Sequence, residues 1–477
     1  MQNPSDLRGG ARLLAGLTLT LWASACTASE EQAPADPNAG IVEAEEGTPG
    51  EPAAGGETAE QAGESAEGAG AEPEAPAESE EPVDWAVLGA GILEQVSEYR
   101  GLDVLGEVPI ETADGEAART YTMERLFSLS SEEELQAQAR VAKLLGLLAP
   151  QVDLLELVVT FVQDQAGGFY DPVRGQIFVL PGFSGALARA VLAHELTHAL
   201  DDQRYNLQAS MEARSEDADA LAAFHAVMEG SAMVVQEQWS REQLSMDELL
   251  EVAQESADQS AELFEAPAFL WRPLLCSYLQ GTAFLKRAPD AQRAATRSAD
   301  PIDVARAFAD PPRSTEQILH PEKYWDDEMV DVPTRVRVEP VADSGWDFVH
   351  ADGLGELGLA ELFLDGSAPP AGAMLTIRFV HPATEGWDGD RFALFEREGA
   401  EYLTGWIVFD SEAEAEEFEA AFGAGPRATI ERAAQRLGDE TGGVRLLRDG
   451  ANVTLEVYSS ETALPEQLAD VAAFSAS

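Results

Sequence analysis

The sequence predicts an α+β protein, in which a mainly helical domain with a small sheet precedes a smaller α+β domain. Three observations support this. Apolar residues recur with helical spacing through much of 85–340, two short β-rich runs flank the turn sequence "DPVRG", and strand-like alternation dominates after about residue 345. At 477 residues the chain exceeds the usual size of one domain, so two folded units are expected. We place them at residues 85–340 and 341–477.

The N-terminus has the features of an export signal, predicted over residues 1–25. Arg8 and Arg12 precede the apolar run "LLAGLTLTLWA", which is too short for a dedicated membrane span. The run ends at "ASAC", which resembles the lipobox of bacterial lipoproteins with Cys26 as the lipid-bearing residue. Ordinary signal cleavage would cut the same bond. We therefore expect an outer-membrane or cell-surface lipoprotein, with a secreted or periplasmic protein as the alternative.

Residues 26–84 form a predicted acidic linker. The segment 27–84 holds seventeen acidic residues and no Lys or Arg, and it is rich in Ala, Gly, Pro and Ser. Such a composition buries too little apolar surface to offset chain entropy, which predicts disorder. A stalk that holds the folded part away from a membrane is one use, and a tolerated spacer is the other.

The formal net charge of −57 is not confined to this linker. It leaves about −40 for the rest of the chain, which disfavours binding to nucleic acid and to anionic lipid. No later segment reads as a membrane span, so we expect membrane contact only through the N-terminal anchor. The composition does not indicate an oligomeric state.

The expected elements of the first domain follow from periodicity and turn residues. Ser184 is expected to cap the helix that follows the hairpin at "FYDPVRGQIFVL". The segment 311–324 is punctuated by proline and is expected to be a connector. The predicted helices are 85–100, 133–148, 151–165, 185–204, 215–238, 247–263 and 266–288, with a strand within 105–112.

The second domain is expected to alternate strands with helices and carries no chemical motif. It could bind a partner, present a substrate or inhibit a site elsewhere. The predicted strands are 390–397, 401–410, 443–449 and 452–459, and the predicted helices are 412–422, 428–437 and 463–473.

The stretch "VLAHELTHAL" places two histidines four residues apart on a predicted helix. Residues at this spacing share a face, so His194 and His198 present two imidazoles to one point, as two zinc ligands require. Glu195 lies beside them and can approach a metal-bound water without ligating the metal. The alternative is a pair of structural histidines on an amphipathic helix.

A catalytic zinc needs a third protein ligand. Glu229 lies on a face of its predicted helix that is apolar apart from His225, and a buried carboxylate must be paired or bound to a metal. We therefore choose Glu229, with a salt bridge to an arginine as the alternative. The other downstream candidates are Glu212, Glu216, Asp219 and His225.

HExxH followed by a second helix with "EGSA" resembles the gluzincin branch of zinc metallopeptidases. The likeness rests on His194, Glu195, His198 and Glu229, covers about residues 150–240 and extends loosely over 85–335. It implies one Zn²⁺, a peptide or protein substrate, and a zincin-like fold whose small sheet has an edge strand over the metal. The hairpin at "FYDPVRGQIFVL" is the candidate for that strand.

The expected chemistry is hydrolysis by a zinc-activated water, with Glu195 as general base. A donor to the oxyanion is also expected. His320, His225 and Tyr324 are equal candidates, and a structural hydrogen bond is the alternative for each.

Asp202 is expected to orient a ligand imidazole, with Asp201 as its rival. A non-catalytic, zinc-stabilised binding or scaffold protein remains the alternative function. Glu195 separates the two, because a structural zinc site has no use for a base. Cys276, in an apolar segment, is expected to be a buried small hydrophobe.

Overall fold

The computed structural model describes residues 84–113, 131–165, 167–180, 184–370 and 373–477, with three single residues between 113 and 131. From Asp84 to the C-terminus these residues group into one compact unit by their contacts. The predicted signal 1–25, Cys26 and the linker up to residue 83 lie outside the described residues.

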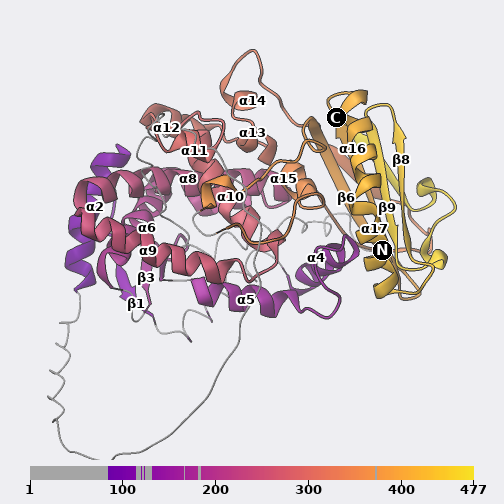
Figure 1. Ribbon diagram of the computed structural model, residues 1–477, viewed down its shortest axis with the longest axis horizontal. Helices are drawn as coiled ribbons and strands as arrows, with labels where there is room; N and C mark the ends of the chain where they lie inside the picture. Colours follow the sequence, from indigo (N-terminus) through magenta and orange to yellow (C-terminus); the bar gives the residue numbers. More distant parts are fainter. Residues whose placement is uncertain are drawn as a thin grey trace, which may run out of the picture. The chain divides into compact units, whose positions relative to one another are not determined.

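The α+β prediction is confirmed: a mainly helical region carries a small sheet, and a sheet with flanking helices follows it (Figure 1). The helices of the first region are α2 (Trp85–Arg100), α4 (Glu132–Leu144), α5 (Leu154–Gln165), α6 (Gly185–Tyr205), α7 (Leu207–Glu212), α8 (Ala218–Gln243), α9 (Met246–Leu263), α10 (Ala268–Leu285), α11 (Ala291–Ala294), α12 (Pro301–Ala309), α13 (Thr315–Leu319) and α14 (Glu322–Trp325). The last two lie in the segment predicted as a connector.

The helix α6 runs through the core of the helical region. It is buried on nearly all sides from Ala186 to Asp201, which explains why its apolar residues follow no single stripe. Ser184 stands at the N-cap position, but its side chain makes no capping hydrogen bond, so that part of the prediction is wrong. Asn206 ends the helix in the left-handed conformation, which asparagine tolerates, and its side chain caps α7.

The helices α8 and α10 cross at two glycines. A Cβ on Gly230 would lie 2.4 Å from the carbonyl carbon of Gly281, and a Cβ on Gly281 would lie 2.0 Å from the carbonyl oxygen of Ala226. Only glycine permits this approach, which brings the residue after Glu229 against α10. By length and composition α8 could cross a membrane, contrary to expectation, but it is mostly buried inside the protein.

The predicted hairpin is present in a three-stranded sheet of order β1–β3–β2. Its strands are β1 (Ile110–Thr112), β2 (Gly168–Asp171) and β3 (Gln176–Val179). β2 pairs antiparallel with β3, and β1 pairs parallel with it. β2 is therefore an edge strand, and its other side faces α6.

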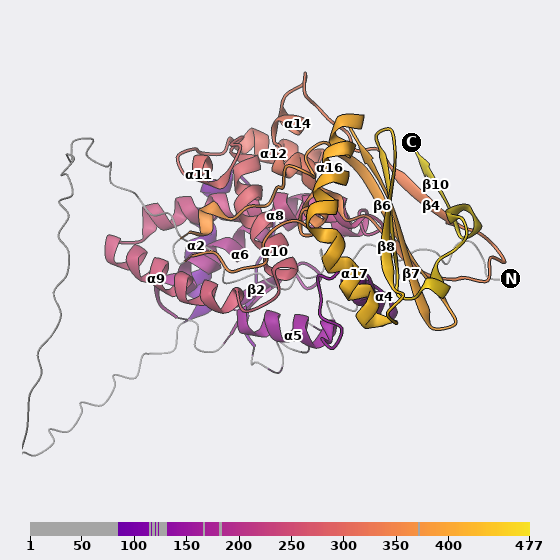
Figure 2. The same cartoon turned by 45° about the vertical axis from the view of Figure 1, so that its right-hand side comes forward.

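The second region is built on a five-stranded antiparallel sheet of order β5–β6–β7–β9–β8. Helices α16 and α17 lie along one face and bury their apolar residues against it (Figure 2). The elements are β5 (Asp347–Asp352), α15 (Gly355–Ala360), η2 (Met374–Thr376), β6 (Trp387–Arg397), β7 (Ala400–Phe409), α16 (Glu412–Ala424), α17 (Pro426–Leu437), β8 (Gly443–Asp449) and β9 (Asn452–Tyr458).

The predicted helix 463–473 is wrong. Residues 461–476 instead form the short turns η3 (Glu461–Ala463) and η4 (Leu468–Asp470) and the strand β10 (Ala472–Ala476). Pro465 interrupts helical hydrogen bonding, and β10 finds a distant partner in β4 (Val336–Pro340), with which it pairs antiparallel. The strand β4 lies before the predicted domain boundary, so the last strand of the chain pairs across it.

Ion pairs join the helical region to the sheet region. The ammonium of Lys323 contacts Glu316 at 2.6 Å, Asp331 at 2.8 Å and Asp410 at 3.0 Å, and Asp410 follows strand β7. Arg140 of α4 binds Glu396 and Glu401 of the sheet. The two regions therefore share buried and half-buried charges as well as apolar surface.

Candidate metal centre

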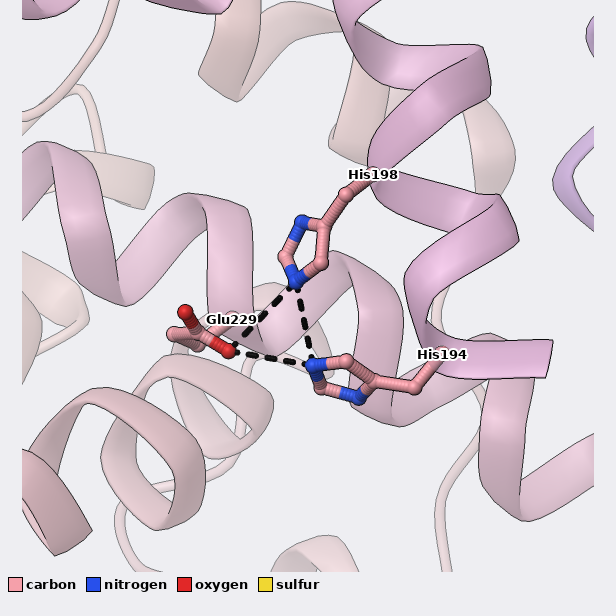
Figure 3. A group of neighbouring side chains, drawn as sticks. All are labelled: His194, His198 and Glu229. Carbon is pink, nitrogen blue, oxygen red and sulfur yellow. Dashed lines mark hydrogen bonds and ion pairs between the residues drawn. The ribbon is translucent and has the colours of Figure 1, made fainter. Parts of the chain in front are cut away.

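Two helices bring three ligand atoms to one point (Figure 3). His194 and His198 extend from successive turns of α6, and Glu229 reaches them from α8. The two imidazole Nε2 atoms are 3.0 Å apart, and Oε2 of Glu229 lies 3.2 Å from Nε2 of His194 and 3.6 Å from Nε2 of His198. The group can hold a metal ion.

These distances fit a small metal. Ligands about 2.0–2.1 Å from a tetrahedral ion lie about 3.3 Å from one another, close to the three separations found here. Within the described part of the chain, Oε1 of Glu229 is buried and has no hydrogen-bond partner. A buried carboxylate oxygen left in this way is what a bound cation would satisfy.

Burial and mutual contacts shift the pKa values of His194 and Glu229. His194, His198 and Glu229 are 3%, 0% and 1% exposed. Burial lowers the pKa of His194, so its ring is neutral at physiological pH. Burial alone would raise the pKa of Glu229, but the imidazoles of His198 and His194 lower it to about 2. A neutral imidazole, as His194 has, and an ionised carboxylate, as Glu229 has, are forms that bind metal.

Glu195 points beside the ligand group and meets the edge strand. The backbone N–H of Tyr170 in β2 donates to its Oε2 at 2.8 Å, while its Oε1 is buried without a partner among the described residues. Burial, and then the negative charge of Glu229, raises the pKa of Glu195 well above its usual value. This carboxylate is therefore oriented by the sheet and disposed to take up a proton.

Among the described residues, no Lys or Arg balances the carboxylates of Glu195 and Glu229 at the centre. Arg100 is bound to Asp201 at 2.8 Å, with both side chains buried. In the described ranges neither Glu195 nor Glu229 forms an ion pair with Lys or Arg, so the arginine salt bridge considered for Glu229 is not found there. A divalent cation would balance these two carboxylates.

The other candidate third ligands lie elsewhere. Glu212 and Glu216 are exposed, and the buried carboxylate of Asp219 accepts hydrogen bonds from the amide and hydroxyl of Thr315. His225 lies one turn before Glu229 and is buried, which lowers its pKa to about 4. Of the five candidates, Glu229 is the one that contacts both histidines.

The predicted orienting residue is wrong. Asp202 accepts hydrogen bonds from the Tyr170 hydroxyl at 2.7 Å and from the amide of Leu207 at 2.8 Å, so it fastens the hairpin and α7 to α6. Gln236 contacts a ligand imidazole, and its Oε1 lies 3.0 Å from Nδ1 of His194.

Asp201, the rival to Asp202, is buried near His198 and is held by Arg100 and by the Ser231 hydroxyl at 2.7 Å. Burial raises its pKa, and the positive charge of Arg100 opposes this effect. Asp201 therefore links α6, close to His198, to Arg100 of α2 and to Ser231 of α8.

Two of the three predicted oxyanion donors are engaged away from the centre. Nε2 of His320 lies 3.1 Å from Oε1 of Glu356, and the Tyr324 hydroxyl donates to the carbonyl of Asp310 at 2.7 Å. His225 is the one that lies near the ligand group, where its pKa responds to Glu229 and His198.

Sequence reasoning missed three residues around the centre. Gln236 lies seven residues after Glu229, so a shared helical face could have identified it. Arg100 and Tyr278 come from α2 and α10, and the ring of Tyr278 lies 5.9 Å from that of His194. No local signal links these two residues to the motif.

Comparisons with known proteins add one match. Residues 345–468 match a family described as a domain of unknown function (DUF8575), which covers the five-stranded sheet and its helices and leaves out the metal centre. No curated protein and no solved structure matches the chain. Any function must therefore be argued from the metal centre itself.

Proposed function

We propose that this chain is a zinc-dependent metallopeptidase. The observation that carries the proposal is the buried group of His194, His198 and Glu229. Glu195 lies close enough to be influenced by the charge of Glu229, and its Oε1 is buried with no hydrogen-bond partner among the described residues. Two imidazoles and one carboxylate leave a coordination position open, which is the arrangement of catalytic zinc sites. The resemblance of the same four residues to the gluzincin metallopeptidases agrees with this.

Glu195 separates hydrolysis from other uses of the same ligands. Two histidines and a carboxylate also bind ferrous iron in oxygenases. Glu195 lies next to the ligands but is not one of them. A buried glutamate in such a position has no role in a purely structural metal site. Its raised pKa suits a group that accepts a proton and then returns it.

The roles of the residues follow from their placement. Zinc in this group would act as a Lewis acid and lower the pKa of a water molecule to about 7. Glu195, fixed by the Tyr170 amide, accepts the proton of the attacking water and delivers it to the leaving amine. His225 is the remaining candidate of the three for stabilising the oxyanion, as a neutral donor.

The edge strand β2 offers a means of holding the substrate. In a strand, the backbone N–H and C=O groups of successive residues point to alternate sides. The amide of Tyr170 points to Glu195 and away from β3, so Glu195 lies on the unpaired side of β2. An extended peptide bound along this side would lie beside Glu195, and it would replace part of the present contact between β2 and α6, because all four residues of β2 are buried. In this proposal the protein is exported and anchored through a lipid on Cys26.

The test is peptide-library cleavage, followed by mass spectrometry, with zinc content measured on the same samples. The wild-type protein and Glu195→Gln should each bind one zinc. Only the wild type should cleave, and the variant should lose about 10²–10⁴-fold in rate. One zinc in both proteins without cleavage would favour the scaffold alternative, and no zinc in either would exclude the site.

A further inference from the structure

Gln236 occupies a place next to the metal centre that ties the two ligand helices together. It lies two turns after Glu229 on α8, and its Oε1 is 3.0 Å from Nδ1 of His194 on α6. Both side chains are buried. The helix α8 therefore supplies both the third ligand, Glu229, and a residue that contacts the first ligand, His194.

The contact determines which nitrogen of His194 is available. Nε2 faces Oε2 of Glu229 and Nε2 of His198, so a metal would have to bind Nε2. A neutral imidazole with a free lone pair on Nε2 carries its proton on Nδ1, and that proton needs an acceptor. An amide oxygen only accepts, so with a metal on Nε2 the Nδ1–H of His194 would donate to Oε1 of Gln236.

The neutral amide also matters for charge. Glu195 and Glu229 already place two carboxylates at the buried centre, which one divalent cation balances. A third carboxylate at position 236 would leave an excess negative charge in a desolvated place, at a cost in stability. Glutamine provides the acceptor without this charge.

We propose that Gln236 is a positioning residue that holds His194 in the tautomer that binds metal through Nε2, without adding charge to the centre. The inference rests on the proposed zinc occupant and does not depend on peptide cleavage. Residues that orient ligand histidines in this way typically contribute 10–100-fold to metal affinity, so the effect is measurable.

The experiment is zinc affinity by chelator competition, with the thermal midpoint of the metal-free protein measured alongside. Gln236→Met keeps the size of the side chain and removes the acceptor, and it should weaken zinc binding about 10–100-fold. Gln236→Glu restores an acceptor and should keep zinc affinity at or above the wild-type value, while lowering the thermal midpoint of the metal-free protein. Gln238→Met is the matched control on α8, where the amide of Gln238 donates to Glu242, and should change neither value.

Two results would overturn the proposal. One is wild-type zinc affinity in Gln236→Met. The other is an equal loss of affinity in Gln236→Met and Gln236→Glu together with a lower thermal midpoint, which would show that Gln236 acts only through packing. If the wild type binds zinc but cleaves no peptide, the peptidase proposal fails and this one stands. If the wild type binds no zinc, both fail.

Discussion

The surroundings of Glu229 and Glu195 push the two carboxylates toward opposite protonation states. Imidazoles hold the pKa of Glu229 at about 2, and burial together with Glu229 raises that of Glu195. Pairs of titratable groups separated in this way are found where one group binds and the other moves protons. At the scale of residues, this division supports the roles of ligand and base.

His350 gives a test of acid stability away from the centre. Burial, assisted by the nearby Arg391, lowers the pKa of His350 to about 4, below the 6.5 of an unfolded histidine. The stability from keeping this ring neutral is present above pH 6.5 and is lost as pH falls toward 4, because the unfolded chain binds the proton first. The loss amounts to about 3 kcal/mol.

His350→Gln should therefore lose less stability on acidification than the wild type. Urea unfolding at pH 7 and pH 4.5 measures the difference, with His381→Gln as a control at a more exposed histidine. Parallel losses in the wild type and His350→Gln would contradict the assignment.

Local sequence spacing predicted some residues of the metal centre and could not predict others. His194 and His198 follow from helical periodicity, and Glu229 follows from the apolar face on which it lies. Asp202 lies on the expected stripe, yet its carboxylate meets Tyr170 of a hairpin, which no local pattern indicates. His320 and Tyr324 were proposed by position along the chain, and long-range packing turns them toward Glu356 and Asp310.

At the scale of elements, the crossing of α8 and α10 positions the third ligand. Gly281→Ala would place a methyl group against the carbonyl oxygen of Ala226, so the helices must separate. We expect a loss of about 1–3 kcal/mol, less any gain in helix propensity, and weaker zinc binding because Glu229 moves with α8. Thermal unfolding and chelator competition measure the two effects.

The control is Gly91→Ala in α2, where an added Cβ meets no atom within 4 Å. This substitution should stabilise the protein by about 0.5–1 kcal/mol and leave zinc affinity unchanged. A stable Gly281→Ala protein with full zinc affinity would show that the close approach of the helices is not required.

Elements with strong local patterns were predicted well. The helix at 85–100 and the hairpin around "DPVRG" need only periodicity and turn residues. The helix predicted at 463–473 runs into the first two residues of β10, whose pairing partner, β4, lies more than a hundred residues earlier in the sequence. Pairing over such a distance leaves no periodic signal in a short Ala-rich segment.

At the scale of the whole molecule, Lys323 joins the helical region to the sheet region. Its ammonium contacts three carboxylates, of which that of Glu316 is fully buried. Lys323→Met would leave this acidic group without its cation. Because burial raises the pKa of Glu316 to about 8, the group can take up a proton when the ammonium is removed, so we expect a loss of about 1–3 kcal/mol. Urea unfolding measures the loss. Arg293→Met, which breaks an exposed ion pair with Asp290, is the control and should cost under about 1 kcal/mol.

Metal binding should stabilise the whole unit. A ligand that binds only the folded state adds about 4 kcal/mol at a concentration a thousand times its dissociation constant. Removing zinc with a chelator should therefore lower the thermal midpoint, and adding zinc back should restore it. His198→Ala should unfold at the same temperature with and without zinc. A zinc-dependent midpoint in that variant would place the metal elsewhere.

The most direct test of the metal centre is zinc K-edge X-ray absorption on the protein loaded with one equivalent of zinc. The account predicts a four-coordinate shell of nitrogen and oxygen at about 2.0–2.1 Å, with the outer-shell pattern of two imidazoles, and no sulfur. A sulfur at about 2.3 Å, or a six-coordinate shell of oxygen alone, would contradict ligation by His194, His198 and Glu229.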